Sequence, residues 1–281
     1  MDGPAAAGRS GAISRPAARK ADAIVEHGGT GSEFENGSLG GERVRIKVIA
    51  TGSTREDRAA GNWGLSLLLG DDLLFDTHGV SAILKRRLRE ERVNVLGIRD
   101  IVISHDHWDH TNGLWDLLLQ NRTVNVHVCP HAAQPLTRNI ETFGGFVRPC
   151  GGFQSIRDGV VTTGELPAAL NGNTLYEQAL VLASAAGLVV VTGCAHPGIV
   201  TILEKARQWS GGKIYLALGG FHLLDASDAE ILRVIDRMKD LGVANVAPTH
   251  CTGARATELM RHHFGSHFVE LRNGSNVEIP G

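Results

Sequence analysis

Aromatic residues and paired cysteines are scarce in this sequence of 281 residues. Phe, Trp and Tyr make up only 5% of the chain, so aliphatic side chains must supply most of the hydrophobic core. The four cysteines include no C-x-x-C pair, and a chain of this length needs no disulfide framework to fold. Together these features predict a reducing compartment, and we expect a cytoplasmic protein.

The sequence also lacks a long hydrophobic run and a strong excess of charge. No stretch of about 18 apolar residues is present, which disfavours a transmembrane helix. Lys and Arg number 28 and Asp and Glu number 30, a formal net charge of -2. This balance disfavours broad docking onto nucleic acid or an anionic membrane. We therefore expect neither as a partner, and the oligomeric state stays open.

The chain divides into a short biased segment and one long patterned region. Residues 1–42 are rich in Gly, Ala and Ser without a sustained apolar period, so they bury too little surface to offset their ordering entropy, and we predict disorder there. Over residues 43–281, hairpins and helices mix in an order that fits two sheets packed face to face with helices outside. Gly pairs interrupt residues 132–175, which we interpret as a loop-rich insertion near the mouth of a site.

Four potential metal ligands lie within six residues, directly after the predicted strand Asp100–Ser104. In an extended chain residues i and i+2 point the same way, so His105 and His107 can hold one ion. Asp109 and His110 follow where the loop turns into a helix, and they can face a second ion. Imidazole and carboxylate ligands favour Zn, Fe or Mn over Mg or Ca.

Three more histidines, His196, His222 and His250, each follow a predicted strand beside Gly or Pro. A single histidine in such a place is usually a hydrogen-bonded loop residue. Because one cluster cannot complete two coordination shells, three histidines in matching contexts are candidates for the missing ligands.

The pattern H-x-H-x-D-H after a strand, preceded by Phe75-Asp76-Thr77, resembles the signature of the metallo-β-lactamase superfamily. Within it, the segments FDTHG, ISHDHWDHTNGL, VVVTGCAHPGIV, ALGGFHLL and APTHCTG are similar to one branch, the 7,8-dihydropterin-6-methyl-4-(β-D-ribofuranosyl)aminobenzene-5'-phosphate synthase-like proteins. The resemblance covers most of residues 43–281. It implies a four-layer αββα sandwich, an α/β fold, with a binuclear site at one edge.

Residue by residue, the resemblance implies a first metal held by His105, His107 and His196. It implies a second metal held by Asp109, His110 and His250, with Asp76 orienting the ligands from behind. Many members have T-G-D, with a bridging aspartate, where this chain has Thr192-Gly193-Cys194. Cys194 is then either a bridging thiolate or a small packed hydrophobic residue. His78 stands where the turn more often has Gly. It is a spare ligand, a proton shuttle or only a surface residue, and we favour the last interpretation.

A metal with an open position lowers the pKa of its water from about 16 toward 7 and so supplies hydroxide at neutral pH. We therefore expect a hydrolase with two divalent ions, Zn favoured over Fe or Mn, in which this hydroxide attacks a small anionic ester, phosphoester or lactone. Asp109 is expected to accept a proton and His222 to donate one to the leaving oxygen. Thr252 and Gly253 precede a predicted helix, whose free N–H groups we expect to bind an anionic substrate group.

Other functions stay open beside this one. The synthase branch suggests a transferase that uses its metals to polarise the substrate. Some superfamily members cut RNA, but the net charge of -2 argues against that activity here. A di-iron redox centre is a further alternative, although such a centre normally needs a flavin partner. A non-enzymatic module would use its metals only for folding.

Overall fold

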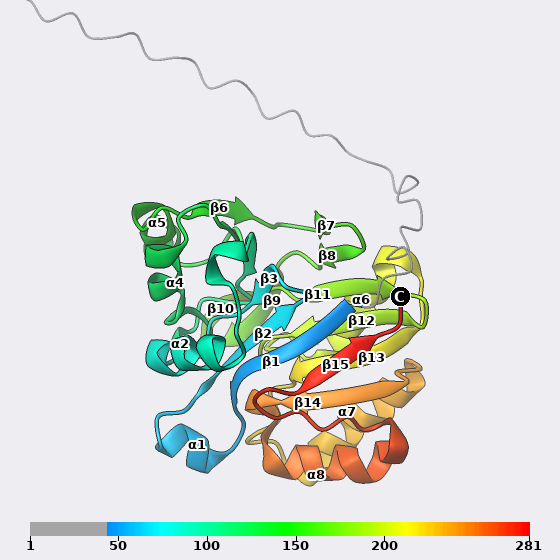
Figure 1. Ribbon diagram of the computed structural model, residues 1–281. Coiled ribbons are helices and arrows are strands. Elements are labelled where there is room, and N and C mark those ends of the chain that lie inside the picture. The colour runs from blue at the N-terminus through cyan, green and yellow to red at the C-terminus, as the bar shows by residue number, and fades with distance from the viewer. Residues whose placement is uncertain (1–43) are drawn as a thin grey trace, which may run out of the picture. The chain divides into compact units, whose positions relative to one another are not determined.

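Two β-sheets form the centre of the described part of the chain, residues 44–281, in the computed structural model (Figure 1). One has seven strands in the order β15-β1-β2-β3-β4-β5-β6, the other has six in the order β14-β13-β12-β11-β8-β7, and β9 and β10 form a separate hairpin. The predicted disorder of residues 1–42 lies outside the described residues. The strands are β1 (Val44–Gly52), β2 (Gly64–Leu69), β3 (Leu73–Phe75), β4 (Asp100–Val102), β5 (Asn125–Val128), β6 (Phe146–Pro149), β7 (Gln154–Arg157), β8 (Val160–Thr162), β9 (Leu166–Leu170), β10 (Asn173–Glu177), β11 (Leu180–Ser184), β12 (Gly187–Thr192), β13 (Ile214–Gly220), β14 (Asn245–Thr249) and β15 (Asn276–Ile279).

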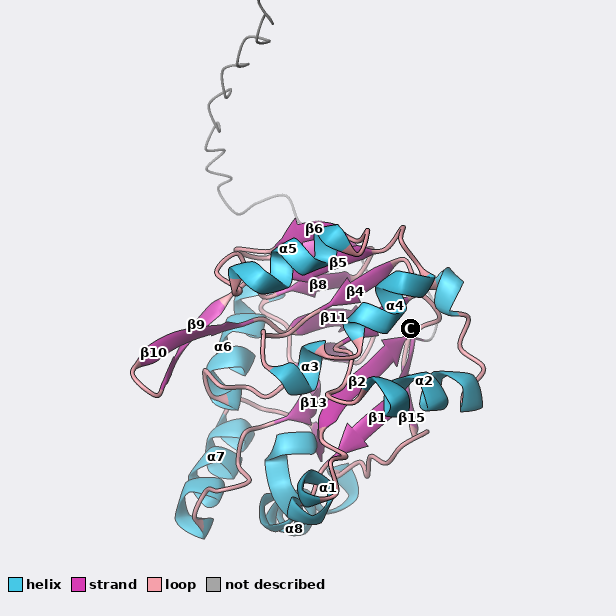
Figure 2. Ribbon diagram, turned by 90° about the vertical axis from the view of Figure 1, so that its left-hand side faces the viewer, coloured by secondary structure: helices cyan, strands magenta, loops and turns pink. Residues whose placement is uncertain are grey.

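Helices cover the outer face of each sheet (Figure 2). No helix within residues 44–281 is both long and apolar enough to cross a membrane. The α-helices are α1 (Arg55–Ala59), α2 (Ser81–Glu90), α3 (Trp108–Thr111), α4 (Leu114–Gln120), α5 (Gln134–Thr142), α6 (Ile199–Ser210), α7 (Asp228–Asp240) and α8 (Gly253–Phe264).

Alternation along the strands explains the four layers. In β2, Leu67 and Leu69 point into the core between the sheets, where they join Leu182 and Val191 of the opposite sheet. Leu68 points the other way, into the core beneath α2, α4 and α5. A third core lies between the six-stranded sheet and α6, α7 and α8. The arrangement confirms the expected αββα sandwich.

The strand directions position the site. β3 and β4 run parallel, and so do β12, β13 and β14. Loops that leave the carboxyl ends of neighbouring parallel strands emerge at the same edge of a sheet, where ligands commonly bind. The loops after β4, β12, β13 and β14 carry the histidines singled out in the sequence.

Residues 132–175 hold more regular structure than their glycine pairs suggested. Helix α5 buries Leu136 and Ile140, β6 extends the seven-stranded sheet, and β7 and β8 extend the other. The helix is hard to recognise because only these two buried residues, four apart, mark its inner face. The pair Gly144-Gly145 marks the end of helix α5 and not a loop. Gly144 has a φ of +95°, a conformation that glycine adopts readily after a helix. The β9–β10 hairpin does reach the mouth of the site, where Asn171 lines a pocket.

Candidate metal centre

The first three predicted ligands come together at the sheet edge. His105 Nε2 lies 3.1 Å from His107 Nδ1, with both residues on the loop between β4 and α3. Two imidazole nitrogens on one tetrahedral Zn²⁺ would be about 3.3 Å apart, so a single cation fits between them. His196, from the loop after β12, completes the group, with its ring centroid 4.6 Å from that of His105 and 4.9 Å from that of His107.

The second three predicted ligands form an adjacent group. Asp109 Oδ2 lies 3.3 Å from His250 Nε2 and 3.6 Å from His110 Nε2. The Nδ1–H of His250 donates to the carbonyl of Gly52 at 3.1 Å, so Nε2 carries the lone pair. This buried Nε2 has no hydrogen-bond partner among residues 44–281. A divalent cation would satisfy it, and the donor set of imidazoles and a carboxylate is the one such a cation prefers.

Cys194 lies between the two groups. Its Sγ is within 4.8 Å of the ligand atoms of His105 and His196 on one side and of Asp109, His110 and His250 on the other. The separation from His110 Nε2 is 3.3 Å. Burial raises the pKa of this thiol, so a nearby cation would be needed to hold it as a thiolate. Its position is compatible with the bridging interpretation, which stays a prediction.

A buried carboxylate, Asp76, holds ligands of both groups from behind. Its Oδ2 accepts a hydrogen bond from His110 Nδ1 at 2.7 Å and another from Ser104 Oγ at 2.8 Å. The Ser104 hydroxyl in turn accepts from His105 Nδ1 at 2.9 Å. Both imidazoles are thereby fixed with Nε2 facing the site, which is the support that metal-binding histidines usually have.

A second buried carboxylate, Glu177, was missed in the sequence. It accepts hydrogen bonds from the backbone N–H groups of Cys194, Ala195 and His196 at 2.7–2.8 Å. Its Oε2 also accepts from His196 Nδ1 at 2.9 Å, which leaves His196 Nε2 free for a cation. The available signal was an acidic residue three positions before the apolar strand that begins at Leu180, which the β11–β12 hairpin places opposite the loop of His196.

Charge around the second group is strongly coupled. Burial opposes the ionisation of Asp109, but His110 and His250 beside it hold its pKa well below the usual range. Burial would likewise lower the pKa of His110, but the carboxylates of Asp76 and Asp109 raise it to about 9. The carboxylate charge stays in the site and is available to neutralise a cation.

The first group behaves differently. Burial, helped by His110 and His196, holds the pKa of His105 well below its usual value, and burial together with His196 lowers that of His107. Both rings are therefore neutral at pH 7 and can offer lone pairs. Burial would raise the pKa of Glu177, but His105 and the hydrogen bond from His196 keep it well below the usual range.

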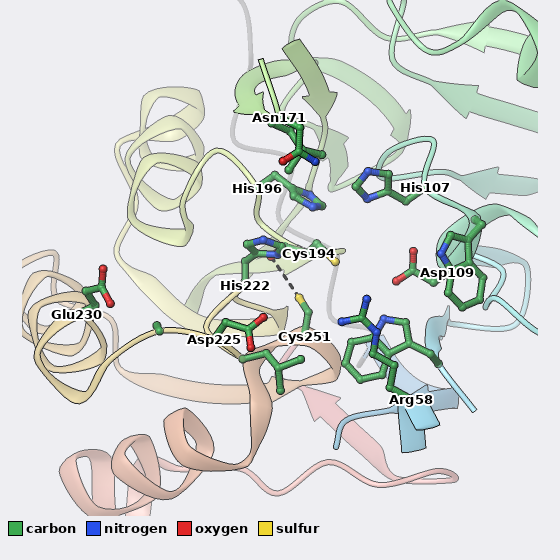
Figure 3. Close-up of a pocket in the computed structure, with 15 residues that line it drawn as sticks. Arg58, His107, Asp109, Asn171, Cys194, His196, His222, Asp225, Glu230 and Cys251 are labelled. Atoms are coloured by element: carbon green, nitrogen blue, oxygen red, sulfur yellow. Dashed lines mark hydrogen bonds between the residues drawn. The ribbon is translucent and has the colours of Figure 1, made fainter. Parts of the chain in front are cut away.

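Both groups open onto a pocket of about 540 Å³ (Figure 3). His222, from the loop after β13, lines it beside His196, with ring centroids 4.3 Å apart. A hydrogen bond with Cys251 raises the pKa of His222 despite partial burial. His222 belongs to neither of the two ligand groups, but its ring lies with the thiols of Cys194 and Cys251 in a third set whose ligand atoms are within 4.8 Å of one another. Because it also lines the pocket, it is placed to meet a bound molecule.

The structure does not bring Thr252 and Gly253 to the pocket. The hydroxyl of Thr252 accepts a hydrogen bond from the backbone N–H of Phe221 at 3.0 Å. Gly253 lies against Leu224, since a Cβ atom there would be 2.8 Å from that residue's Cα. The first turn of α8 is thus covered by the chain itself, and the expected anion site has no room there.

The interpretation of His78 as a surface residue is wrong. Its side chain is fully buried, and Nδ1 accepts a hydrogen bond from the backbone N–H of Val80 at 3.0 Å. A positive φ of +59° turns it inward. Burial, together with His250 nearby, lowers its pKa to about 4, so the ring is neutral.

Comparisons with known proteins agree with this geometry. The chain is 28% identical to the 7,8-dihydropterin-6-methyl-4-(β-D-ribofuranosyl)-aminobenzene-5'-phosphate synthase of Methanocaldococcus jannaschii, over 85% of this chain and 97% of that protein. The solved structure of Tm1679, described as a metal-dependent hydrolase of the β-lactamase superfamily, superposes with a TM-score of 0.69 at 26% identity, covering 85% of this chain and all of that one.

A more distant structure shares the fold. The short form of human tRNase Z superposes with a TM-score of 0.56 at 13% identity, covering 84% of this chain and 99% of that one. The profile of the Metallo-beta-lactamase superfamily matches residues 68–250, which include every residue of the two groups. The chain therefore belongs to the metallo-β-lactamase superfamily.

Proposed function

We propose that this protein is a metal-dependent hydrolase that cleaves a small anionic ester, phosphoester or lactone. The observation that carries the proposal is the pair of ligand groups that meet at Cys194, with the lone pair of His250 Nε2 left unpartnered in the second group. His105, His107 and His196 would hold one divalent cation, and Asp109, His110 and His250 would hold the other. Zn²⁺ suits this donor set best, with Fe or Mn as alternatives.

Two such cations would supply hydroxide at neutral pH and polarise the bond that is attacked. The residues of the chain have separate tasks. The depressed pKa of Asp109 keeps its carboxylate ionised, so it can accept a hydrogen bond from the attacking water and orient it. His222 faces the pocket with a raised pKa, so its imidazolium can donate a proton to the leaving oxygen.

The test is a hydrolysis screen with zinc-loaded protein and 4-nitrophenyl phosphate, 4-nitrophenyl acetate and an aryl lactone. We expect turnover of at least one class, abolished by chelation. His222→Gln should lower kcat about 100-fold by removing the proton donor, with the largest loss for the poorest leaving group. Arg86→Gln, on the exposed side of α2, is the matched control and should leave kcat unchanged. A blank screen over all three classes would contradict the proposal.

A transferase is the second candidate, because the similarity to the M. jannaschii synthase covers nearly all of that protein. In this function the same residues would polarise a substrate rather than supply hydroxide. Incubation with a dihydropterin donor and a ribofuranosyl-aminobenzene phosphate, followed by mass spectrometry, would show a joined product. The cytoplasmic location and the absence of nucleic-acid and membrane partners stay predictions.

A further inference from the structure

We propose that Arg58 and Trp108 form a substrate subsite beside the second ligand group, which binds an aromatic or heteroaromatic ring that carries an anionic group of its own. The inference rests on the proposed function, which places bond cleavage at the metal positions. The ring and its anionic group are the part of the substrate that is bound but not cleaved. It also replaces the anion site expected at Thr252 and Gly253, which the fold covers.

Arg58 is held in place at the edge of the pocket. It lies in the short helix α1, whose first turn is fixed by a reciprocal capping box between Thr54 and Asp57. Its guanidinium lies 5.5 Å from the ring centroid of Trp63. Trp63 is buried and packs against the imidazole of His250, with ring centroids 4.7 Å apart. Two successive ring contacts thus connect Arg58 to a candidate metal ligand.

The charge of Arg58 is available to a ligand. No carboxylate within residues 44–281 forms an ion pair with it, although it lines the pocket and points into it (Figure 3). The two acidic residues on the outer rim are already engaged. Asp225 pairs with Arg55, and Glu230 accepts hydrogen bonds from the backbone and hydroxyl of Ser227. At the outer rim an incoming anion therefore meets the Arg58 guanidinium, unpaired among the described residues, and two carboxylates that already have partners, while the third lining carboxylate, Asp109, belongs to the second ligand group.

Trp108 supplies a flat apolar wall. It stands between His107 and Asp109 in the sequence and is 50% exposed, which is unusual for so large an apolar side chain. One edge of the indole lies on Gly79, where a Cβ atom would be 2.4 Å from Cζ3. The absence of a side chain at position 79 therefore allows this edge of the ring to approach the backbone. The rest of the ring lines the pocket.

The same close packing brings the two parts of the subsite together. The Cβ position at Gly79 is 2.5 Å from the backbone oxygen of Trp63 and 2.4 Å from the indole of Trp108. The backbone of Trp63, whose ring lies under Arg58, is therefore a neighbour of the Trp108 indole, and all three residues line the same pocket. An indole stacks on planar rings, and a guanidinium forms paired hydrogen bonds with carboxylate or phosphate. The combination selects a planar ring with an anionic substituent.

The experiment uses phosphonates, which bind to metals but are not hydrolysed. Dissociation constants of methylphosphonate, phenylphosphonate and the 3- and 4-phosphonobenzoates are measured by calorimetry with zinc-loaded protein. Phenylphosphonate should bind about tenfold more tightly than methylphosphonate, because its ring stacks on Trp108. At least one phosphonobenzoate should gain about another tenfold, because its carboxylate reaches Arg58.

The variants separate the two contributions. Trp108→Leu should remove the advantage of phenylphosphonate over methylphosphonate, and Arg58→Gln should remove only the advantage of the phosphonobenzoate. The control Arg86→Gln should change neither ratio. If both ratios survive the variants, the subsite is overturned even where hydrolysis is observed. Binding ratios that follow the prediction in a protein without hydrolytic turnover would instead contradict only the proposed function.

Discussion

The two candidate metal positions have the same distribution of ligands along the sequence, but different residues hold those ligands in place. Each takes two residues from the segment after β4 and one distant histidine, but His105 and His107 lie in the loop whereas Asp109 and His110 lie in helix α3. His196 of the first position depends on Glu177, which also binds three backbone N–H groups of the loop that carries it. His250 of the second position depends on the carbonyl of Gly52, at the end of a strand in the core. The first position is therefore built on an ordered loop, and the second on packed strand ends.

Replacement of Glu177 should have the largest effect. In Glu177→Gln the amide nitrogen would face the N–H groups of His196, and a buried charge that balances the histidines would be lost. We expect the free energy of unfolding to fall by about 3–5 kcal/mol. Chemical denaturation measures this loss, with Glu258→Gln on the exposed face of α8 as the control. A loss below about 0.5 kcal/mol, the range of surface substitutions, would show that the loop does not depend on Glu177.

Replacement of Asp76 should affect the second position more than the first. Asp76→Asn presents an amide nitrogen to His110 Nδ1, and the affinity for the second metal should drop about 10–100-fold. The comparison is made in a His250→Ala background, which keeps the first position only. There Glu177→Gln should remove the remaining metal and Asp76→Asn should retain most of it. Equal losses would mean that Asp76, which reaches His105 through Ser104, supports the first position as strongly as Glu177 does.

The sequence revealed the ligands much better than it revealed their supports. His105, His107, Asp109 and His110 stand together within six residues of the sequence, so their spacing alone indicates a metal site. His196 and His250 stand out because each follows a strand that ends at the same edge. Glu177 lies 19 residues from His196 in the sequence, and the β11–β12 hairpin, which pairs Leu180 with Val191 and Ser184 with Gly187, brings it opposite the loop that follows β12. The hairpin register brings the carboxylate to that loop, but no motif in the sequence marks Glu177 as the support of a ligand.

Arg58 and Trp63 escaped notice for a related reason. The short helix α1 buries none of its residues, so no hydrophobic period indicates it. The ring contacts with His250 exist only because β1 and β14 end side by side. Thr252 and Gly253 are the opposite case, because the sequence predicted a binding site there and the structure covers it. A helix start after a strand looks like an anion site in sequence, but the packing of Leu224 covers it.

A buried histidine behind the second position should make the protein sensitive to acid. The pKa of His78 is lowered to about 4 in the folded protein, below its unfolded value near 6.5. Its neutral form therefore contributes full stability above pH 6.5, and this contribution falls away as the pH drops toward 4. The loss of unfolding free energy from this titration is at most about 3 kcal/mol between pH 6.5 and pH 4.

His78→Asn is the variant that isolates this effect. Asn tolerates a positive φ, and its carbonyl oxygen can accept the hydrogen bond from Val80 N–H. The unfolding free energy of the variant should therefore decline less than that of the wild type between pH 6.5 and 4. Parallel curves for the two proteins would exclude His78 as the titrating group.

Replacement of Cys194, which lies between the two metal positions, should have the smallest effect on metal binding. If Cys194 bridges them, cobalt-loaded protein should show a thiolate-to-metal band in the near ultraviolet, and Cys194→Ser should abolish it while weakening metal binding about tenfold. Cys150→Ser should retain the band, because Cys150 belongs to none of the sets of possible ligands among residues 44–281. A band that persists in Cys194→Ser would identify Cys194 as a packed residue instead.

The metal content of the purified protein tests the two positions most directly. Elemental analysis after zinc loading and dialysis should give about two ions per chain for the wild type and for the surface variant His262→Ala. His107→Ala should retain about one ion and His250→Ala about one, since each removes a ligand from a different position. A zinc content that is unchanged in both of these variants would contradict the assignment of the ligands.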